Sequence, residues 1–256
     1  MKKDKGSSDR FGYEWKKYNK ISLDYEKQFL KWVYPLTQKD FKNKKILDAG
    51  CGIGRNSFWP LKYGAEEVVA FDYDTATLNS AKKNLGNFEN CKIFHGSIYN
   101  IPYENYFDIS FSIGVIHHLE KPLEAISSLI KATKKNGIVL IWVYGYENNE
   151  FIVKYLNPLR KITSRLPPKI THLITYLFSI PIYFYLKLFN QKRDYFKQIS
   201  RFKFWHVHSI CFDQLLPKIA NYWTKSQALE LLERFNLKNI KIFPVNNMSW
   251  TVIGTK

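Results

Sequence analysis

The sequence predicts an α/β protein of the doubly wound type, in which helices cover both faces of a largely parallel sheet. Apolar segments of strand length alternate with helical segments from Ile46 to Tyr144, an order typical of βαβ units. The first strand runs directly into three alternating glycines, Gly50, Gly52 and Gly54. Such glycines let the backbone bend sharply and bring main-chain N–H groups close to a ligand. The sequence therefore predicts a cofactor loop after the first strand.

Asp48, two residues before the first glycine, narrows the choice of cofactor. A carboxylate here would repel the pyrophosphate of a dinucleotide and attract a cation. S-adenosylmethionine (SAM) carries a sulfonium and an ammonium group, so it fits this loop better than NAD does. The spacing Gly-x-Gly-x-Gly also differs from the dinucleotide pattern Gly-x-Gly-x-x-Gly. A strand-to-helix turn that binds no ligand is the alternative interpretation.

Residues 47–55, Leu-Asp-Ala-Gly-Cys-Gly-Ile-Gly-Arg, resemble the first motif of the class I SAM-dependent methyltransferases. The likeness is to the bacterial type that acts in small-molecule, sugar and lipid pathways. It implies a Rossmann-like, doubly wound, seven-stranded mixed sheet whose final strand is antiparallel. It also implies SAM as the cofactor, with contacts from Asp48, Gly50, Cys51, Gly52 and Gly54.

The second predicted strand, 67–71, ends in Asp72, twenty residues after Gly52. At this distance an acidic residue closes the second strand of a Rossmann-like half and accepts hydrogen bonds from ribose hydroxyls. The family resemblance implies the same role. Asp72 is therefore a candidate ribose ligand, and the adjacent Tyr73 is a candidate cofactor contact.

A predicted helix over 75–85 and a third strand over 91–95 lead to Gly-Ser-Ile at 96–98. Members of the family usually have Gly-Asp-x here, and that Asp holds the adenine amino group. Ser97 departs from this pattern, which implies a weaker contact. Ser97 and Ile98 are candidate contacts to the cofactor.

The fourth predicted strand, 107–114, is an apolar run, and Ile113 near its end is a further cofactor candidate. The residues after it include His117-His118-Leu, which resembles the family's fourth motif. Ligands of open α/β sheets lie at the carboxyl ends of strands. One of these histidines is therefore expected to face the methyl acceptor and to take its proton. Anchoring of the loop is the alternative, and adjacent imidazoles without a third ligand do not predict a metal site.

The remaining elements complete the sheet around an insertion. After the fourth strand we expect a helix from Pro122 to Asn136-Gly137, a strand over 138–144, a capped helix over 224–235 and strands over 239–245 and 249–253. The organisation that we expect is an N-terminal lid or helix segment (1–45), a SAM-binding core (46–149), a helical substrate lid inserted between strands five and six (150–223), and a final helix with two strands (224–256).

The segment 10–15, Arg-Phe-Gly-Tyr-Glu-Trp, resembles a lead that many bacterial methyltransferases carry before the first motif. In the family this lead lies across the cofactor, so Tyr13 and Trp15 are candidate lid residues. Packing of these rings on the core is the alternative. The helix predicted to follow has Tyr25 and Trp32 on its apolar face.

The net charge of +17 is divided unevenly along the chain. Residues 46–149 hold 9 Lys and Arg against 11 Asp and Glu, residues 1–45 hold 13 against 6, and residues 150–256 hold 17 against 5. Basic flanks fit an anionic acceptor or an anionic membrane surface. Because 32 of the 39 basic residues are lysine, an AT-rich genome explains the charge equally well.

Two observations favour a cytoplasmic location. The first ten residues lack the apolar segment of a secretory signal. The three cysteines, Cys51, Cys91 and Cys211, have neither disulfide nor zinc spacing.

Within the insertion, residues 170–186 contain no Asp, Glu, Lys or Arg. This length is at the short limit for a membrane-spanning helix, and one crossing would separate the last two strands from their sheet. We therefore expect a helix that is buried in a lid or lies in a membrane interface. The segment 201–208 interleaves basic and aromatic residues, which favours a sugar- or lipid-facing wall over a base-stacking surface.

These observations favour methyl transfer from SAM to a small-molecule, sugar or lipid-linked acceptor, at oxygen or nitrogen, with the protein placed peripherally at a membrane. The mechanism expected is an in-line displacement in which the protein mainly positions the reactants. An RNA or protein methyltransferase that docks through the basic flanks is one alternative. It is not favoured, because residues 112–115, Ser-Ile-Gly-Val, lack the Asn/Asp-Pro-Pro-aromatic motif of base-amine methyltransferases. A membrane-associated protein with this fold but no catalysis is the other alternative.

Overall fold

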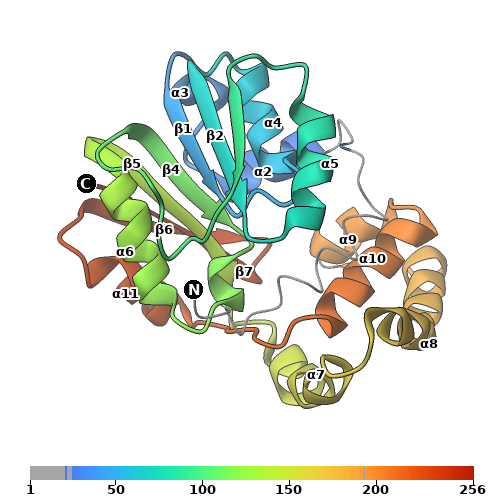
Figure 1. Cartoon of the computed structure of the whole chain (residues 1–256). Helices are drawn as coiled ribbons and strands as arrows, with labels where there is room; N and C mark the ends of the chain where they lie inside the picture. Colours follow the sequence, from blue (N-terminus) through green and yellow to red (C-terminus); the bar gives the residue numbers. More distant parts are fainter. Residues whose placement is uncertain (1–20, 22–24, 193) are drawn as a thin grey trace.

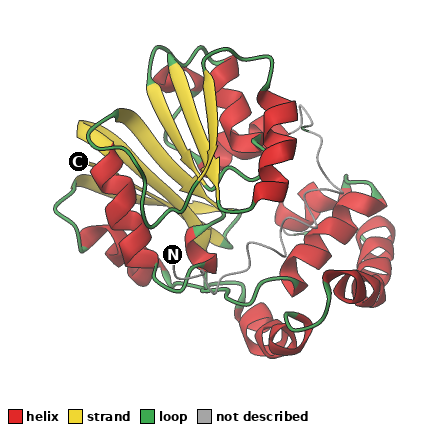
Figure 2. Ribbon diagram, viewed as in Figure 1, coloured by secondary structure: helices red, strands yellow, loops and turns green. Residues whose placement is uncertain are grey.

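The strands of the protein form one mixed sheet, in a computed structural model that describes residues 21, 25–192 and 194–256. The strand order is β3-β2-β1-β4-β5-β7-β6 (Figures 1 and 2). The strands are β1 (Lys45–Ala49), β2 (Glu67–Asp72), β3 (Cys91–His95), β4 (Phe107–Ile113), β5 (Thr133–Tyr144), β6 (Lys238–Val245) and β7 (Ser249–Thr255). β1 to β5 pair in parallel, and β7 pairs antiparallel with both of its neighbours. The predicted seven-stranded fold is confirmed.

Helices flank the sheet and also form the insertion between β5 and β6. They are α2 (Tyr25–Trp32), α3 (Gln38–Phe41), α4 (Arg55–Lys62), α5 (Thr75–Leu85), the 3₁₀ helix η1 (Ile116–His118), α6 (Pro122–Ala132), the π-helix η2 (Ile152–Leu156), α7 (Asn157–Thr163), α8 (Pro168–Leu188), α9 (Asp194–Ser200), α10 (Phe204–Leu215) and α11 (Lys225–Glu233). The predicted capping box at Thr224 begins α11. Tyr13 and Trp15 lie outside the described residues.

Two apolar cores, one on each face of the sheet, hold the layers together. Successive side chains of a strand point to opposite faces, and β1 shows this alternation at Ile46 and Leu47. Ile46 packs with Phe29 of α2 and Phe41 of α3. Leu47 belongs to the other core, with Ile126 of α6 and residues of α11. The near-continuous apolar run of β1 therefore follows from burial on both faces.

β5 begins earlier than the sequence predicted. The helix pattern was expected to continue to Asn136-Gly137, but α6 ends at Ala132 and the strand starts at Thr133. The buried Thr133 hydroxyl lies 2.8 Å from both the Ser110 hydroxyl and the Leu129 carbonyl oxygen. This contact with β4 anchors a β-branched residue that also favours a strand. The tertiary contact thus overrides the local pattern.

The insertion folds as a group of helices beside the sheet (Figure 1). α8 contains the uncharged stretch 170–186 and packs along α10. Leu186, Ile199 and Val207 form a small apolar core within the insertion. Within the described part of the chain, no helix combines the length and the apolar character that crossing a membrane requires.

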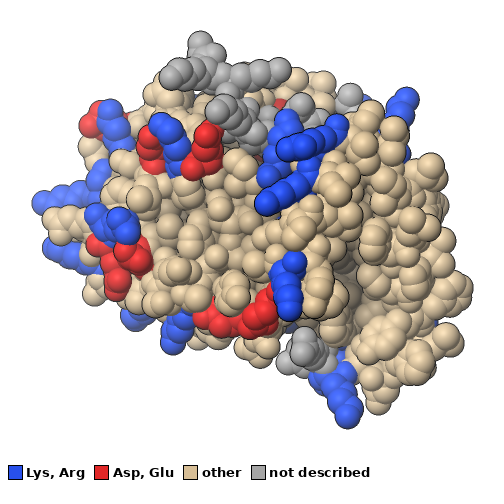
Figure 3. Space-filling view, turned by 90° about the horizontal axis from the view of Figure 1, so that it is seen from below, with Lys and Arg blue, Asp and Glu red and all other residues tan. Residues whose placement is uncertain are grey.

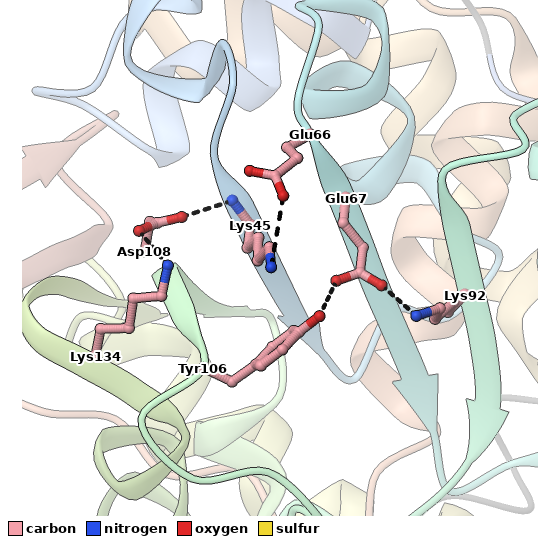
Figure 4. A network of polar contacts seen from close by, with 7 residues as sticks. All are labelled: Lys45, Glu66, Glu67, Lys92, Tyr106, Asp108 and Lys134. Atoms are coloured by element: carbon pink, nitrogen blue, oxygen red, sulfur yellow. Dashed lines mark hydrogen bonds and ion pairs between the residues drawn. The ribbon is translucent and has the colours of Figure 1, made fainter.

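A polar network closes the edge of the sheet at the amino ends of its strands (Figure 4). The Asp108 carboxylate accepts hydrogen bonds from the Lys45 main-chain N–H at 2.8 Å and from Lys134 Nζ at 2.9 Å. Beside it, Glu67 accepts from the Tyr106 hydroxyl at 2.7 Å and pairs with Lys92 at 2.6 Å. Partial burial raises the pKa of Asp108, but the bonds from Lys134 and Lys45 outweigh it, and the pKa lies below its ordinary value.

We expect Asp108→Asn to lower the free energy of unfolding at pH 7 by about 0.5–1 kcal/mol, the range of a partly exposed ion pair. A carboxyl whose pKa is lower in the folded state stabilises the fold above its unfolded pKa of about 4. That contribution disappears as the pH falls through the folded pKa. Urea unfolding should therefore show a difference at pH 7 that shrinks below about pH 4.

The matched control is Glu66→Gln. Glu66 is exposed, and its Oε1 lies 3.5 Å from Lys45 Nζ, so this ion pair is longer than the pair of Asp108 with Lys134. This variant should change stability less than Asp108→Asn does. If Asp108→Asn lowers the free energy of unfolding equally at pH 7 and below pH 4, the stabilising role assigned to the Asp108 carboxylate is contradicted.

Candidate functional site

A cavity of about 1500 Å³ opens at the carboxyl ends of β1, β2 and β4. One end is lined by the glycine loop after β1 and by residues that follow β2 and β3. The other end is lined by residues of the insertion, from η2 to α10. Single-ligand pockets usually measure about 300–1,000 Å³, so this cavity has room for more than one small molecule.

The glycine loop lies against β2 through its main chain. The N–H groups of Gly50 and Cys51 both donate to the Phe71 carbonyl oxygen at 2.9 Å. Gly50 has φ +87°, and a Cβ at this position would lie 2.4 Å from Val115 Cγ2. Gly50, Cys51 and Gly52 line the cavity. Close packing against Val115 thus requires glycine at position 50, where the wall of the cavity is main chain.

Asp72 is held in place by that loop. One carboxylate oxygen accepts from the Gly52 N–H at 2.8 Å, and the other accepts from the Asp74 N–H at 2.9 Å. Burial raises the pKa of Asp72 above its ordinary value, although the bonds from Asp74 and Gly52 oppose the rise. Asp72 lines the cavity, and each carboxylate oxygen can accept more than one hydrogen bond. The side chain is therefore oriented before any ligand arrives.

The other residues predicted to contact the cofactor separate into two groups. Those that line the cavity with Asp72 and the loop are Tyr73, Ser97, Ile98 and Ile113. The Ser97 hydroxyl oxygen accepts from the Tyr99 N–H at 3.3 Å, which fixes its direction. Asp48 and Gly54 do not line the cavity. Gly54 begins α4 with φ +81°, where a Cβ would lie 2.6 Å from Leu85.

Asp48 lies behind the glycine loop instead of in the cavity wall. It is fully buried, and its carboxylate accepts a hydrogen bond from the Ser57 hydroxyl at 2.6 Å. Burial raises the pKa of Asp48 to about 7, while the bond from Ser57 opposes the rise. The direct attraction to a cation expected from the sequence is therefore replaced by a contact that ties β1 to α4.

The two adjacent histidines have different surroundings. His117 is fully buried, does not line the cavity, and stacks on Tyr144 with ring centroids 3.6 Å apart. His118 lines the cavity, and its Nδ1 lies 2.8 Å from the Ile219 carbonyl oxygen. A carbonyl only accepts, so Nδ1 carries the proton and Nε2 is the basic nitrogen. Burial lowers the pKa of His118 to about 4, so the ring is neutral at pH 7.

An aromatic wall stands beside the histidines, and the sequence did not predict it. Tyr144 ends β5 and stacks on Tyr222, with ring centroids 5.4 Å apart. Behind Tyr222, the buried Arg160 donates to its hydroxyl at 2.9 Å and to Gln214 Oε1 at 2.6 Å. These residues come from β5, α7, α10 and the segment before α11, so no local pattern links them.

Further cavity residues were predicted only as packing residues. Tyr25 and Trp32 of α2 line the cavity, and the Arg55 guanidinium lies over both rings, at 5.0 and 5.1 Å from their centroids. The aromatic face of the helix predicted before the glycine loop was the available signal. The segment 201–208, predicted to form a sugar- or lipid-facing wall, contributes Lys203 and His206 to the cavity lining.

Among the residues that the structure describes, no group of three or more His, Cys, Asp or Glu side chains could hold a metal ion. Cys51, Cys91 and Cys211 are free thiols.

Residues 47–141 match the family model of a methyltransferase domain. Curated relatives include tRNA U34 carboxymethyltransferases. The one from Helicobacter acinonychis is 30% identical over 129 residues, which cover 48% of this chain and 49% of that protein. The one from Nautilia profundicola is 28% identical over 148 residues, which cover 56% of this chain and 48% of that protein. The chain spans about half the length of the curated relatives it matches.

Solved structures share the fold over nearly the whole chain. A SAM-dependent methyltransferase from Aquifex aeolicus matches with a TM-score of 0.56 and 15% identity, over 95% of this chain and 97% of that one. Magnesium protoporphyrin IX methyltransferase from Synechocystis, solved with bound SAH, matches with a TM-score of 0.57 and 11% identity, over 97% of both chains. The family match covers residues 47–141 as a methyltransferase domain, and the solved structures show that the chain has the fold of these methyltransferases.

Proposed function

We propose that this protein transfers a methyl group from SAM to a small-molecule, sugar or lipid-linked acceptor, at oxygen or nitrogen, in the cytoplasm. One observation carries the proposal. A continuous cavity is lined by the glycine loop and Asp72 at one end and by His118 and the aromatic wall at the other. Such an arrangement can hold two reactants side by side and bring their reacting atoms into line.

The cofactor end fits SAM. The cradle at Gly50 has no space for a side chain, so a ligand there meets main chain directly. We assign the ribose hydroxyls to Asp72, whose carboxylate is oriented by Gly52 and Asp74. The remaining contacts are assigned to Tyr73, Ser97, Ile98, Ile113 and the loop. When bound, SAM supplies the electrophilic methyl group.

The acceptor end offers a base and an aromatic surface. His118 Nε2 is the basic nitrogen of a neutral ring. A hydroxyl becomes a strongly acidic oxonium as it is methylated, so a base with a low pKa is sufficient to take the proton of an oxygen acceptor. Tyr144 and Tyr222 present stacked rings, a surface that suits apolar or sugar groups. Lys203 at the cavity favours an acceptor with an anionic group.

RNA is the second candidate acceptor. The curated relatives named above are tRNA U34 carboxymethyltransferases, and the basic flanks of this chain could bind phosphates. Turnover distinguishes both of these enzyme functions from a third possibility, a non-catalytic protein with this fold, which would bind SAM but would not methylate an acceptor.

Replacement of Asp72 by Ala is expected to weaken SAM binding by about 2–4 kcal/mol, because one or two charge-assisted hydrogen bonds are lost. Titration calorimetry measures this directly. Asp108→Asn, at the opposite edge of the sheet, is the control and should bind SAM as the wild type does. If Asp72→Ala and the wild type bind SAM with equal affinity, Asp72 does not contact the cofactor. No binding by the wild type would contradict the proposed function.

Replacement of His118 by Ala is expected to lower turnover about 100-fold and to leave SAM affinity nearly unchanged, as for loss of a general base. Because the base form exists above its pKa of about 4, turnover by the wild type should not fall between pH 8 and pH 6 through this group. His117→Phe keeps a ring against Tyr144 and should retain most of the activity. Undiminished turnover of His118→Ala would show that His118 is not a general base and that catalysis depends on the positioning of the two reactants.

The acceptor can be identified with labelled SAM and cell fractions from a strain that lacks this gene. We expect the purified enzyme to label the lipid or sugar fraction, because the acceptor end of the cavity is aromatic and apolar. Mass spectrometry should then find a product in wild-type cells that lacks a methyl group in the deletion strain. Label that enters tRNA alone would favour the second candidate.

A further inference from the structure

The outward face of α8 is apolar. Ile170, Leu173, Leu177, Ile180, Phe184 and Leu188 follow one another at spacings of three or four, which places them on one side of a helix. Leu173, Leu177 and Leu188 are 68%, 74% and 74% exposed. Of the sixteen exposed large hydrophobic residues in the described part of the chain, eight lie on α8. This helix therefore concentrates the apolar surface of the protein.

The inward face of the same helix is polar over residues 171–179. Thr171, Thr175 and Ser179 are fully buried and recur at spacings of four. The Thr171 hydroxyl donates to the Thr163 carbonyl oxygen at 3.0 Å, and the Ser179 hydroxyl lies 2.7 Å from Nδ1 of His208. A helix that meets water normally buries its apolar side and exposes its polar side. The polarity of α8 is inverted, as it is when the medium outside the helix is not water.

The surroundings of the stripe are basic. Residues 150–223 contain twelve Lys and Arg against three Asp and Glu. Lys169 precedes the stripe and Lys187 lies in its last turn, with no charged residue between them. Figure 3, in which the insertion lies to the right as in Figure 1, shows a broad surface there with few charged groups. An apolar stripe with basic flanks is complementary to an anionic bilayer, in which acyl chains lie beneath negative headgroups.

We propose that the outward face of α8 is a membrane docking surface, on which the helix lies parallel to an anionic bilayer. Leu173, Leu177 and Phe184 enter the interface, and the lysines of the insertion stay among the headgroups. A second copy of this chain is a poorer occupant, because it would bring two basic surfaces together. The geometry of α8 carries this inference without reference to the reaction.

Docking through α8 would also bring the cavity to the lipid. Phe178 and Ile182 of α8 line the cavity together with residues of α9 and α10. The helix that contacts the membrane thus also supplies part of the acceptor wall. This step rests on the proposed function, and it favours the lipid-linked class of acceptor.

Vesicle sedimentation with the whole chain of 256 residues tests the docking surface. The probes are vesicles of phosphatidylcholine alone and of phosphatidylcholine with about one-third phosphatidylserine, at low and at high salt. We expect binding to the anionic vesicles at least about tenfold tighter than to the neutral ones, and weaker binding at high salt because salt screens the lysines. The variant L173Q/L177Q should reduce binding about tenfold or more. The matched control, Leu123→Gln, removes an exposed leucine of α6 and should bind as the wild type does.

Calorimetry with SAM on each variant shows whether it is folded and keeps the two proposals separate. Retained SAM binding with lost vesicle binding would support the docking surface. Wild-type protein that ignores both kinds of vesicle, or L173Q/L177Q that binds as the wild type does, would overturn it and leave methyl transfer unaffected. A concentration-dependent dimer that L173Q/L177Q abolishes would also overturn it, in favour of a second copy on this face.

Discussion

The hydrogen bond from the Gly52 N–H to the Asp72 carboxylate, 2.8 Å long, joins the ends of two neighbouring strands. It fixes the glycine loop after β1 relative to the end of β2, so the main-chain cradle and the acidic side chain form one unit. The packing of Gly50 against Val115 connects that unit to the end of β4. The other parts of the site are arranged around these three strand ends, which meet because the strands are parallel.

The insertion completes the site from the opposite side. It supplies an aromatic and basic wall and a buried cation, Arg160, that connects α7 to Gln214 and to Tyr222. The sheet therefore provides the glycine loop, Asp72 and the two histidines, and the insertion provides most of the opposite side of the cavity. α8 contributes to two surfaces, because Phe178 and Ile182 line the cavity while its apolar face points outward.

Features set by local sequence could be predicted, and those set by distant contacts could not. The strand order, the glycine loop and the approach of Asp72 to it follow from short-range spacing and from the resemblance to a known motif. The start of β5 at Thr133 depends on a contact with Ser110 of the neighbouring strand. The burial of Asp48 depends on Ser57 and the packing of α4. The stack of Tyr144 on Tyr222 joins residues far apart in the chain, so no window of sequence contains it.

The surroundings of His118 also determine how the enzyme would reset after each turnover. Burial is the main cause that holds the pKa of this ring at about 4, and the nearby Arg160 guanidinium lowers it further. If His118 accepts the proton of the acceptor, the imidazolium that results is a strong acid beside a buried cation. It would pass the proton to bulk water as soon as the product leaves and the cavity fills. The site would then return to its starting charge without a second acid–base residue.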